Sequence, residues 1–120
     1  MKLKIYEYKN CGTCRKALKF LTERKIPFMA VPIREQPPTR DELKKMLNAY
    51  GGDLRKLFNT SGQDYRNLNL KNKLAAMTAH EAIELLAANG NLVKRPFVLT
   101  ERGGFVGFEE KDWSKLLGIH

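Results

Sequence analysis

The chain has 120 residues, of which 42% are hydrophobic, and this length and composition predict a single domain, residues 1–120, with a core of its own. No apolar run approaches the roughly 18 residues that a membrane-spanning helix needs, and the N-terminus lacks the apolar segment of a signal peptide. We therefore expect a cytoplasmic protein that does not bind a membrane. The net charge of +9 favours anionic partners without choosing among them, and direct binding of nucleic acid is not expected.

The chain has two cysteines, Cys11 and Cys14, which form a C-x-x-C pair within the segment YKNCGTCRKA. A predicted strand over residues 3–8 precedes the pair, and a predicted helix over residues 11–24 begins at it. The spacing of three places both sulfurs on one side of the first helical turn, within reach of each other. In a cytoplasmic protein such a pair is typical of redox chemistry rather than of a structural disulfide.

The two cysteines differ in their surroundings. Cys11 lies at the N-terminus of the predicted helix, whose positive end favours a thiolate. Cys14 begins an apolar helix face that continues through Ala17 and Leu21. We therefore expect Cys11 to be the attacking sulfur and Cys14 the sheltered, resolving one. Three cationic side chains lie close by in sequence: Lys9, Arg15 and Lys16.

Three other interpretations of the pair stay open at this point. Cysteine is often a buried small hydrophobic residue without chemistry. C-x-x-C is also half of a zinc site, for which the chain offers only His80 and His120 as histidine ligands. A structural disulfide between Cys11 and Cys14 would close a very short loop and constrain little. We expect no metal and no bound cofactor.

The first third of the chain predicts a parallel βαβ unit. A second strand is expected over residues 26–33, interrupted by Pro32, after the helix over residues 11–24. Strand, helix and strand in this length imply a right-handed crossover with parallel strands. The cysteines then lie at the C-terminal end of the first strand, where open α/β sheets place their sites.

The middle of the chain, residues 39–89, reads as a helical insertion between strands. Two capping boxes mark the starts of helices, Thr39 with Glu42 and Thr78 with Glu81. Between these two helices we expect a short helix over residues 53–58, a polar loop over residues 59–62 and helical turns over residues 65–73.

The last third returns to strands and predicts a hairpin followed by a helix. We expect strands over residues 97–99 and 105–108 around a turn at residues 102–104. A terminal helix over residues 109–117 should face inward with Trp113, Leu116 and Leu117. The order βαβ, helices, ββα is that of a thioredoxin-like fold with a mixed four-stranded sheet. An α/β domain with an unrelated strand order remains an alternative.

Four segments together resemble the ArsC family, the arsenate-reductase and Spx-like proteins built on a thioredoxin fold: CGTCRKA, EQPPTRDEL, LFNTSGQDYRNLNL and Arg95-Pro96. The resemblance covers nearly the whole chain and includes a branch of small bacterial proteins with C-x-x-C and the NTSG segment. It implies that Cys11 is the catalytic cysteine. Arsenate reductases of this family hold the oxyanion with three arginines. One of these positions falls on Arg95 here, and the other two fall on Asn59 and Phe108.

The resemblance also implies roles outside the cysteine pair. Pro96 would be a cis-proline opposite the cysteines that offers backbone groups to a substrate, and Arg95 would face Cys11 and support its thiolate. The alternative is an exposed arginine before a trans-proline that starts an edge strand. The NTSG segment adds three polar side chains, for which substrate binding and a helix-capping loop are both open: Asn59, Thr60 and Ser61.

The expected function is that of a thiol-disulfide oxidoreductase, in which Cys11 attacks a disulfide or oxidised substrate and Cys14 resolves the mixed disulfide. Glutathione is the expected co-substrate, or a glutaredoxin- or thioredoxin-type protein the expected reductant. One alternative is an Spx-like redox-sensing regulator that binds the α subunit of RNA polymerase. The other is a glutathione- and glutaredoxin-dependent arsenate reductase. Spx-like regulators continue into a longer charged tail, whereas this sequence ends at His120, and this difference favours the enzyme.

Overall fold

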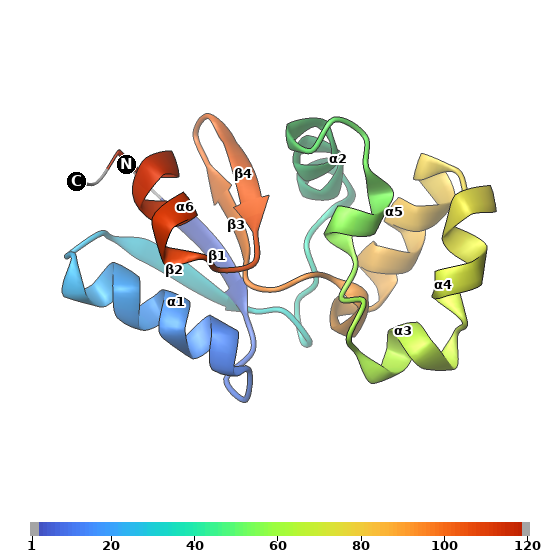
Figure 1. Ribbon diagram of the computed structural model, residues 1–120, viewed down its shortest axis with the longest axis horizontal. Coiled ribbons are helices and arrows are strands. Elements are labelled where there is room, and N and C mark those ends of the chain that lie inside the picture. Colours follow the sequence, from blue (N-terminus) through green and yellow to red (C-terminus); the bar gives the residue numbers. More distant parts are fainter. Residues whose placement is uncertain (1–2, 119–120) are drawn as a thin grey trace.

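A computed structural model describes residues 3–118, and its central element is a four-stranded mixed sheet (Figure 1). The sheet has the order β2-β1-β3-β4. β1 and β2 run parallel, whereas β3 is antiparallel to both of its neighbours. The predicted parallel βαβ unit, the C-terminal hairpin and the mixed sheet are therefore confirmed. The strands are β1 (Leu3–Glu7), β2 (Phe28–Pro32), β3 (Phe97–Thr100) and β4 (Gly103–Val106).

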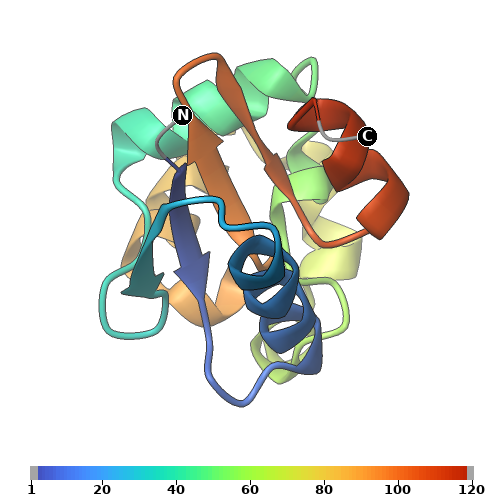
Figure 2. The ribbon, with the colours of Figure 1, turned by 90° about the vertical axis from the view of Figure 1, so that its left-hand side faces the viewer.

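The two faces of the sheet are covered by different sets of helices, because alternate residues of a strand point to opposite faces. Helices α1 (Gly12–Glu23) and α6 (Glu110–Leu116) cover the face on which Ile5 is fully buried. Figure 2 shows α1 lying along the sheet on this side. Tyr6 and Phe97 belong to the core on the other face, where their rings pack edge to face with centroids 5.8 Å apart.

Between β2 and β3 the chain is helical, and these helices form the right half of Figure 1. Both predicted capping boxes are present. The Thr39 hydroxyl accepts from the Glu42 amide while the Glu42 carboxylate accepts from the Thr39 amide, and Thr78 and Glu81 repeat the arrangement. The prediction of a helical segment is confirmed. Its elements are α2 (Arg40–Ala49), η1 (Leu54–Leu57), α3 (Gln63–Asn67), α4 (Leu70–Lys73), η2 (Leu74–Ala76), α5 (Ala79–Ala88) and η3 (Gly90–Leu92), where η marks a 3₁₀ helix.

Two contacts hold this helical segment against the sheet. The Glu42 carboxylate on α2 accepts hydrogen bonds from Lys4 Nζ at 2.8 Å and from the Tyr6 hydroxyl at 2.6 Å, both on β1. At the start of η3, Gly90 lies so close to the chain after β2 that a Cβ there would lie 1.8 Å from the Ile33 carbonyl oxygen. The helices are thus tied to both parallel strands of the sheet.

The predicted boundaries of the C-terminal hairpin were wrong. We expected a turn at residues 102–104 and a strand over residues 105–108, but β4 already begins at Gly103. Glycine is typical of turns, which is why the pattern indicated one. Gly104 instead lies within β4, where only glycine fits, because a Cβ at this position would lie 2.6 Å from the Val98 carbonyl oxygen. The glycine marks a close backbone approach rather than a turn.

One prediction for the terminal helix needs correction. Leu116 was expected to face inward, but its side chain is 58% exposed, whereas Trp113 and Leu117 are buried. Leu117 follows Trp113 by a full turn and shares its face, and Leu116 falls beside that face, where α6 ends. The helical turns expected over residues 65–73 are present as two short helices, α3 and α4, and Asn69 between them adopts a left-handed conformation with φ of 53°.

Candidate active site

Cys11 is the N-cap residue of α1, at the point where the chain leaves β1 and turns into the helix. Its amide donates to the Tyr8 carbonyl at 3.0 Å and closes the turn. Its φ and ψ of −95° and 117° are extended, as is usual for an N-cap. The Cys14 amide donates to Cys11 Sγ at 3.4 Å. The sulfur therefore takes the place of the oxygen of an ordinary cap and accepts one of the amides that the helix leaves unpaired.

Cys11 is half-buried, and several groups favour negative charge on its sulfur. Burial alone would raise the pKa of this thiol. The amide and the thiol of Cys14 and the Arg95 guanidinium outweigh that effect, so the pKa of Cys11 lies below its ordinary value. A lower pKa increases the thiolate fraction at neutral pH, and the thiolate is the reactive form.

Cys14 lies in the opposite environment, fully buried on the face of α1 that also buries Ala17 and Leu21. Burial raises the pKa of the Cys14 thiol to about 12, with the Tyr8 backbone opposing this shift and the Cys11 sulfur adding to it. Cys14 is therefore a protonated thiol with no direct access from solvent. The pair combines one accessible, acidic sulfur with one sheltered, neutral sulfur.

Arg95 and Pro96 directly precede β3, and β3 lies beside β1. Because the two strands are antiparallel, the start of β3 and the end of β1 lie at the same end of the sheet. The peptide bond between Arg95 and Pro96 is cis, the geometry expected for Pro96. Pro96 is buried, and its carbonyl accepts from the Gly107 amide at 2.9 Å.

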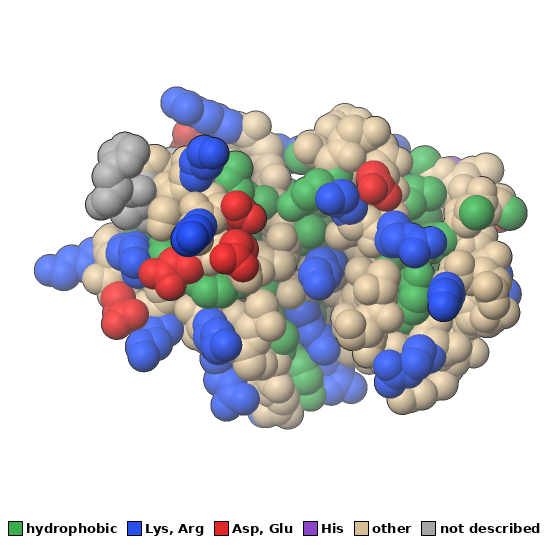
Figure 3. Space-filling model, in the orientation of Figure 1, with side chains coloured by type: hydrophobic (Ala, Val, Ile, Leu, Met, Phe, Trp, Pro, Cys, Tyr) green, Lys and Arg blue, Asp and Glu red, His purple; other side chains and the backbone are tan. Residues whose placement is uncertain are grey.

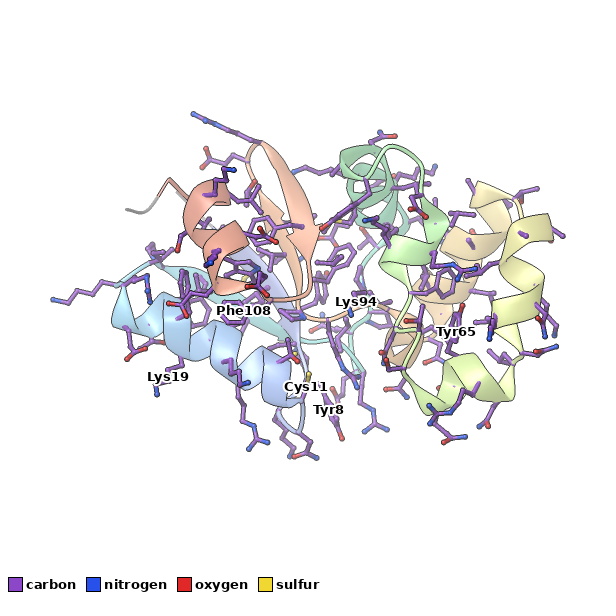
Figure 4. The ribbon with its side chains drawn as sticks, in the orientation of Figure 1. Tyr8, Cys11, Lys19, Tyr65, Lys94 and Phe108 are labelled. Carbon is purple, nitrogen blue, oxygen red and sulfur yellow. The ribbon has the colours of Figure 1, made fainter. Side chains whose placement is uncertain are left out.

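Tyr8 lies beside Cys11 and also contacts Arg34, and the sequence pattern indicated neither Tyr8 nor Arg34 as a site residue. The Tyr8 hydroxyl accepts from Arg34 Nη1 at 2.8 Å, and the guanidinium carbons of Arg34 and Arg95 each lie 4.9 Å from the centroid of the Tyr8 ring. Figure 4 shows Tyr8 next to Cys11. Tyr8 follows β1 and Arg34 follows β2. The rule that placed the cysteines at the ends of parallel strands could therefore have indicated these two residues as well.

Asn59, Thr60 and Ser61 lie on the loop between η1 and α3. The backbone amide of Asn59 donates to the Leu92 carbonyl at 2.7 Å, and the side-chain amide of Asn59 donates to the Asn91 carbonyl at 3.4 Å. These bonds fasten the loop to the segment that leads to Arg95. Thr60 lines a separate cavity. Within residues 3–118, no hydrogen bond joins the three residues to either cysteine. A role in substrate binding stays a prediction.

Phe108, the other position that the resemblance aligns with an arginine, is part of an aromatic cluster. Its ring centroid lies 4.9 Å from that of Trp113 and 5.5 Å from that of Phe20 (Figure 4). The side chain therefore packs between α1 and α6. A phenyl ring has no donor for an oxyanion, so this position contributes nothing to oxyanion binding.

The described part of the chain contains no group of three His, Cys, Asp or Glu side chains arranged to hold a metal ion. His120, which the zinc interpretation would need, lies outside the described residues. None of the helices within residues 3–118 is long and apolar enough to cross a membrane.

Comparison with known proteins identifies relatives over nearly the full length. The sequence model of the ArsC family matches residues 6–116. The uncharacterized protein YusI of Bacillus subtilis is 47% identical over 115 residues, which are 96% of this chain and 98% of that protein. The global transcriptional regulator Spx of Enterococcus faecalis is 30% identical over 115 residues, which are 96% of this chain and 86% of Spx.

A solved structure confirms the fold. The crystal structure of an ArsC family related protein from Bacteroides fragilis superimposes with a TM-score of 0.90 and is 46% identical in sequence. The match covers 97% of this chain and 98% of the other. The predicted thioredoxin-like architecture is therefore correct.

Proposed function

The chain belongs to the ArsC family, and from this membership and the geometry of its cysteine pair we propose that it is a thiol-disulfide oxidoreductase. The family supports a thiol-redox or arsenate reductase-like role. One observation carries the narrower proposal. Half-buried Cys11, with its lowered pKa, accepts a hydrogen bond from the amide of Cys14, whose own thiol is fully buried and neutral. The Cys11 sulfur is therefore suited to attack a disulfide, and the Cys14 sulfur is suited to resolve the mixed disulfide that results.

In the first step the Cys11 thiolate attacks one sulfur of a substrate disulfide. A bond forms between Cys11 Sγ and that sulfur while the substrate S–S bond breaks, and the second substrate sulfur leaves as a thiolate that takes a proton from water. The Arg95 guanidinium and the Cys14 amide stabilise the Cys11 thiolate before the attack. These groups therefore raise the concentration of the reactive form at neutral pH.

In the second step Cys14 resolves the mixed disulfide. Cys11 in a mixed disulfide carries no charge, so the contribution of the Cys11 sulfur that raises the pKa of Cys14 is lost. Cys14 Sγ attacks Cys11 Sγ while the bond between Cys11 Sγ and the substrate sulfur breaks, and the proton of Cys14 passes to the leaving substrate sulfur, which departs as a thiol. The substrate gains two electrons and two protons, and the protein becomes a Cys11–Cys14 disulfide. In the cytoplasm, glutathione or a glutaredoxin- or thioredoxin-type dithiol would return the electrons.

Mass spectrometry of single-cysteine variants with glutathione disulfide tests this assignment. Cys14→Ser should accumulate one glutathione adduct on Cys11, because the resolving sulfur is absent. Cys11→Ser should form none, and the unaltered protein should lose both free thiols without retaining glutathione. Adduct formation on Cys14 in Cys11→Ser, at the rate seen in Cys14→Ser, would reverse the roles of the two sulfurs.

A second candidate function rests on the similarity to Spx, a transcriptional regulator by name. In this role the cysteine pair would act as a redox switch for binding the α subunit of RNA polymerase. A pull-down with the C-terminal domain of the α subunit, using reduced and oxidised protein, separates the two functions. Retention in only one redox state favours the switch, and retention in neither favours the oxidoreductase.

A further inference from the structure

A cavity of about 610 Å³ opens between the helical segment and β4, and neither cysteine lines it. Among the described residues that line this cavity, the one acidic side chain is Asp53. None of the three ion pairs within residues 3–118 uses a cation of this lining. Four positively charged side chains and one negatively charged side chain thus line the cavity. On the right half of Figure 3, where the helical segment lies, basic side chains are more frequent than acidic ones. The cations are Arg55, Lys56, Lys71 and Lys94.

Lys94 is held in place by its backbone and by its surroundings. Its amide donates to the Leu57 carbonyl at 2.8 Å, and its side chain is half-buried. Lys94 Cε would lie 3.5 Å from a Cβ placed at Gly107. The aliphatic stem therefore packs on the glycine backbone, and little conformational freedom remains to be lost when the ammonium group binds an anion.

The cavity also has an aromatic wall. The Tyr50 hydroxyl accepts from the Val106 amide at 2.9 Å, which fixes the ring at the end of α2, and Lys56 Nζ lies 5.9 Å from the centroid of that ring. Phe58 and Tyr65 form the apolar floor with ring centroids 6.2 Å apart. A fixed aromatic wall beside several cations suits a ligand with a flat part and a negatively charged part.

The chemistry of the lining selects the class of ligand. A guanidinium presents a fork of donors that matches phosphate oxygens, and lysines add point charges. The volume falls within the range of about 300–1,000 Å³ that is usual for small-molecule sites. We propose that this cavity binds a small organic phosphate that carries a flat ring and at least two phosphate groups, of the size of a nucleoside diphosphate. This site is independent of the redox function proposed above.

Titration of the ¹⁵N-labelled, reduced full chain with ADP tests the proposal. ADP should cause saturable shifts of the amide resonances of Thr60, Tyr65 and Lys94, which line the cavity. Pyrophosphate, which lacks the ring, should bind more weakly at the same residues. Adenosine, which lacks the phosphates, should cause no saturable shift there. Binding of adenosine as tightly as ADP would overturn the proposal, as would the absence of saturable shifts at several millimolar ADP.

A charge-matched pair of variants excludes general attraction of an anion to a basic protein. Lys56→Gln/Lys94→Gln removes two charges from the cavity and should weaken ADP binding by at least about tenfold. Lys16→Gln/Lys19→Gln removes two charges from α1, neither of which lines the cavity, and Figure 4 shows Lys19 far from Lys94 and Tyr65. This variant should leave the affinity within about twofold at the same ionic strength. Equal losses in both variants would show that net charge alone attracts ADP and would overturn the site. Thermal unfolding of both variants should show cooperative transitions, which checks that they are folded.

Discussion

The guanidinium of Arg95 lies over the ring of Tyr8, with its central carbon 4.9 Å from the ring centroid. Tyr8 closes the turn into Cys11, and Arg95 contributes to lowering the pKa of that thiol. Arg34 lies over the same ring at the same distance. The aromatic ring therefore acts as a support that holds a cation beside the reactive sulfur.

Replacement of Arg95 by alanine should raise the pKa of Cys11, because the variant loses a cation close to the thiolate. In the Cys14→Ser background, alkylation by iodoacetamide at pH 7 should slow several-fold and recover at high pH, where the thiol is ionised in both proteins. Arg24→Ala is the matched control. Arg24 lies over the ring of Phe20 and pairs with Glu110 near the opposite end of α1, so this change should leave the alkylation profile unaltered. An unchanged profile in Arg95→Ala would contradict the prediction.

Replacement of Tyr8 by leucine should shift the pKa of Cys11 in the same direction but by less, since Arg95 keeps its charge and loses only its support. Tyr8→Phe keeps the aromatic face and loses only the hydroxyl that accepts from Arg34. Its alkylation profile should therefore stay close to that of the unaltered protein. An equal rise in the pKa of Cys11 in Tyr8→Phe and in Tyr8→Leu would show that the hydroxyl rather than the ring is the important group.

Stability should depend on pH through Cys14. Burial keeps its folded pKa near 12, whereas an unfolded cysteine loses its proton at about 8.5. Above pH 8.5 the unfolded state therefore binds fewer protons, and the free energy of unfolding falls as pH rises, by at most about 1.4 kcal/mol per pH unit. Urea unfolding of Cys11→Ser at pH 7.5 and 9.5 measures this loss. Cys11→Ser/Cys14→Ala should lack it, and an equal loss in both variants would assign it to other groups.

Gly90→Ala should destabilise the fold by more than about 3 kcal/mol, because the new Cβ would lie 1.8 Å from the Ile33 carbonyl oxygen, a backbone atom that cannot simply rotate away. Gly12→Ala is the control. Its Cβ would meet no atom within 4 Å, in the first turn of α1. Urea unfolding of both variants checks the difference, and equal stabilities would show that η3 can move away from β2 at little cost.

Arsenate should be a poor substrate. Two of the three arginine positions implied by the family resemblance hold Asn59, which bonds to the backbone of Asn91, and Phe108, which packs against Trp113. Two missing charge-assisted donors would weaken oxyanion binding by about 3 to 6 kcal/mol. Glutathione- and glutaredoxin-coupled arsenate reduction, with Cys11→Ser as the blank, measures this. Efficient turnover at micromolar arsenate would refute the prediction.

The features that the sequence predicted correctly depend on neighbours along the chain. The capping boxes of α2 and α5 are contacts between residues three apart, and the placement of Cys11 at the N-cap of α1 follows from strand and helix periodicity on either side of it. The hairpin boundaries failed because Gly104 responds to the backbone of the adjacent strand, which a local pattern does not contain.

Local sequence patterns were enough to identify the cysteine pair, the difference in exposure between Cys11 and Cys14, and the thioredoxin-like order of elements. The charged and aromatic groups around the reactive sulfur depend on the folded chain. Only the sheet, with β1 between β2 and β3, brings Arg34 and Arg95 to the ring of Tyr8, which contacts both. A thiol pKa depends on charges within a few ångströms, and strand order rather than sequence distance sets which charges those are.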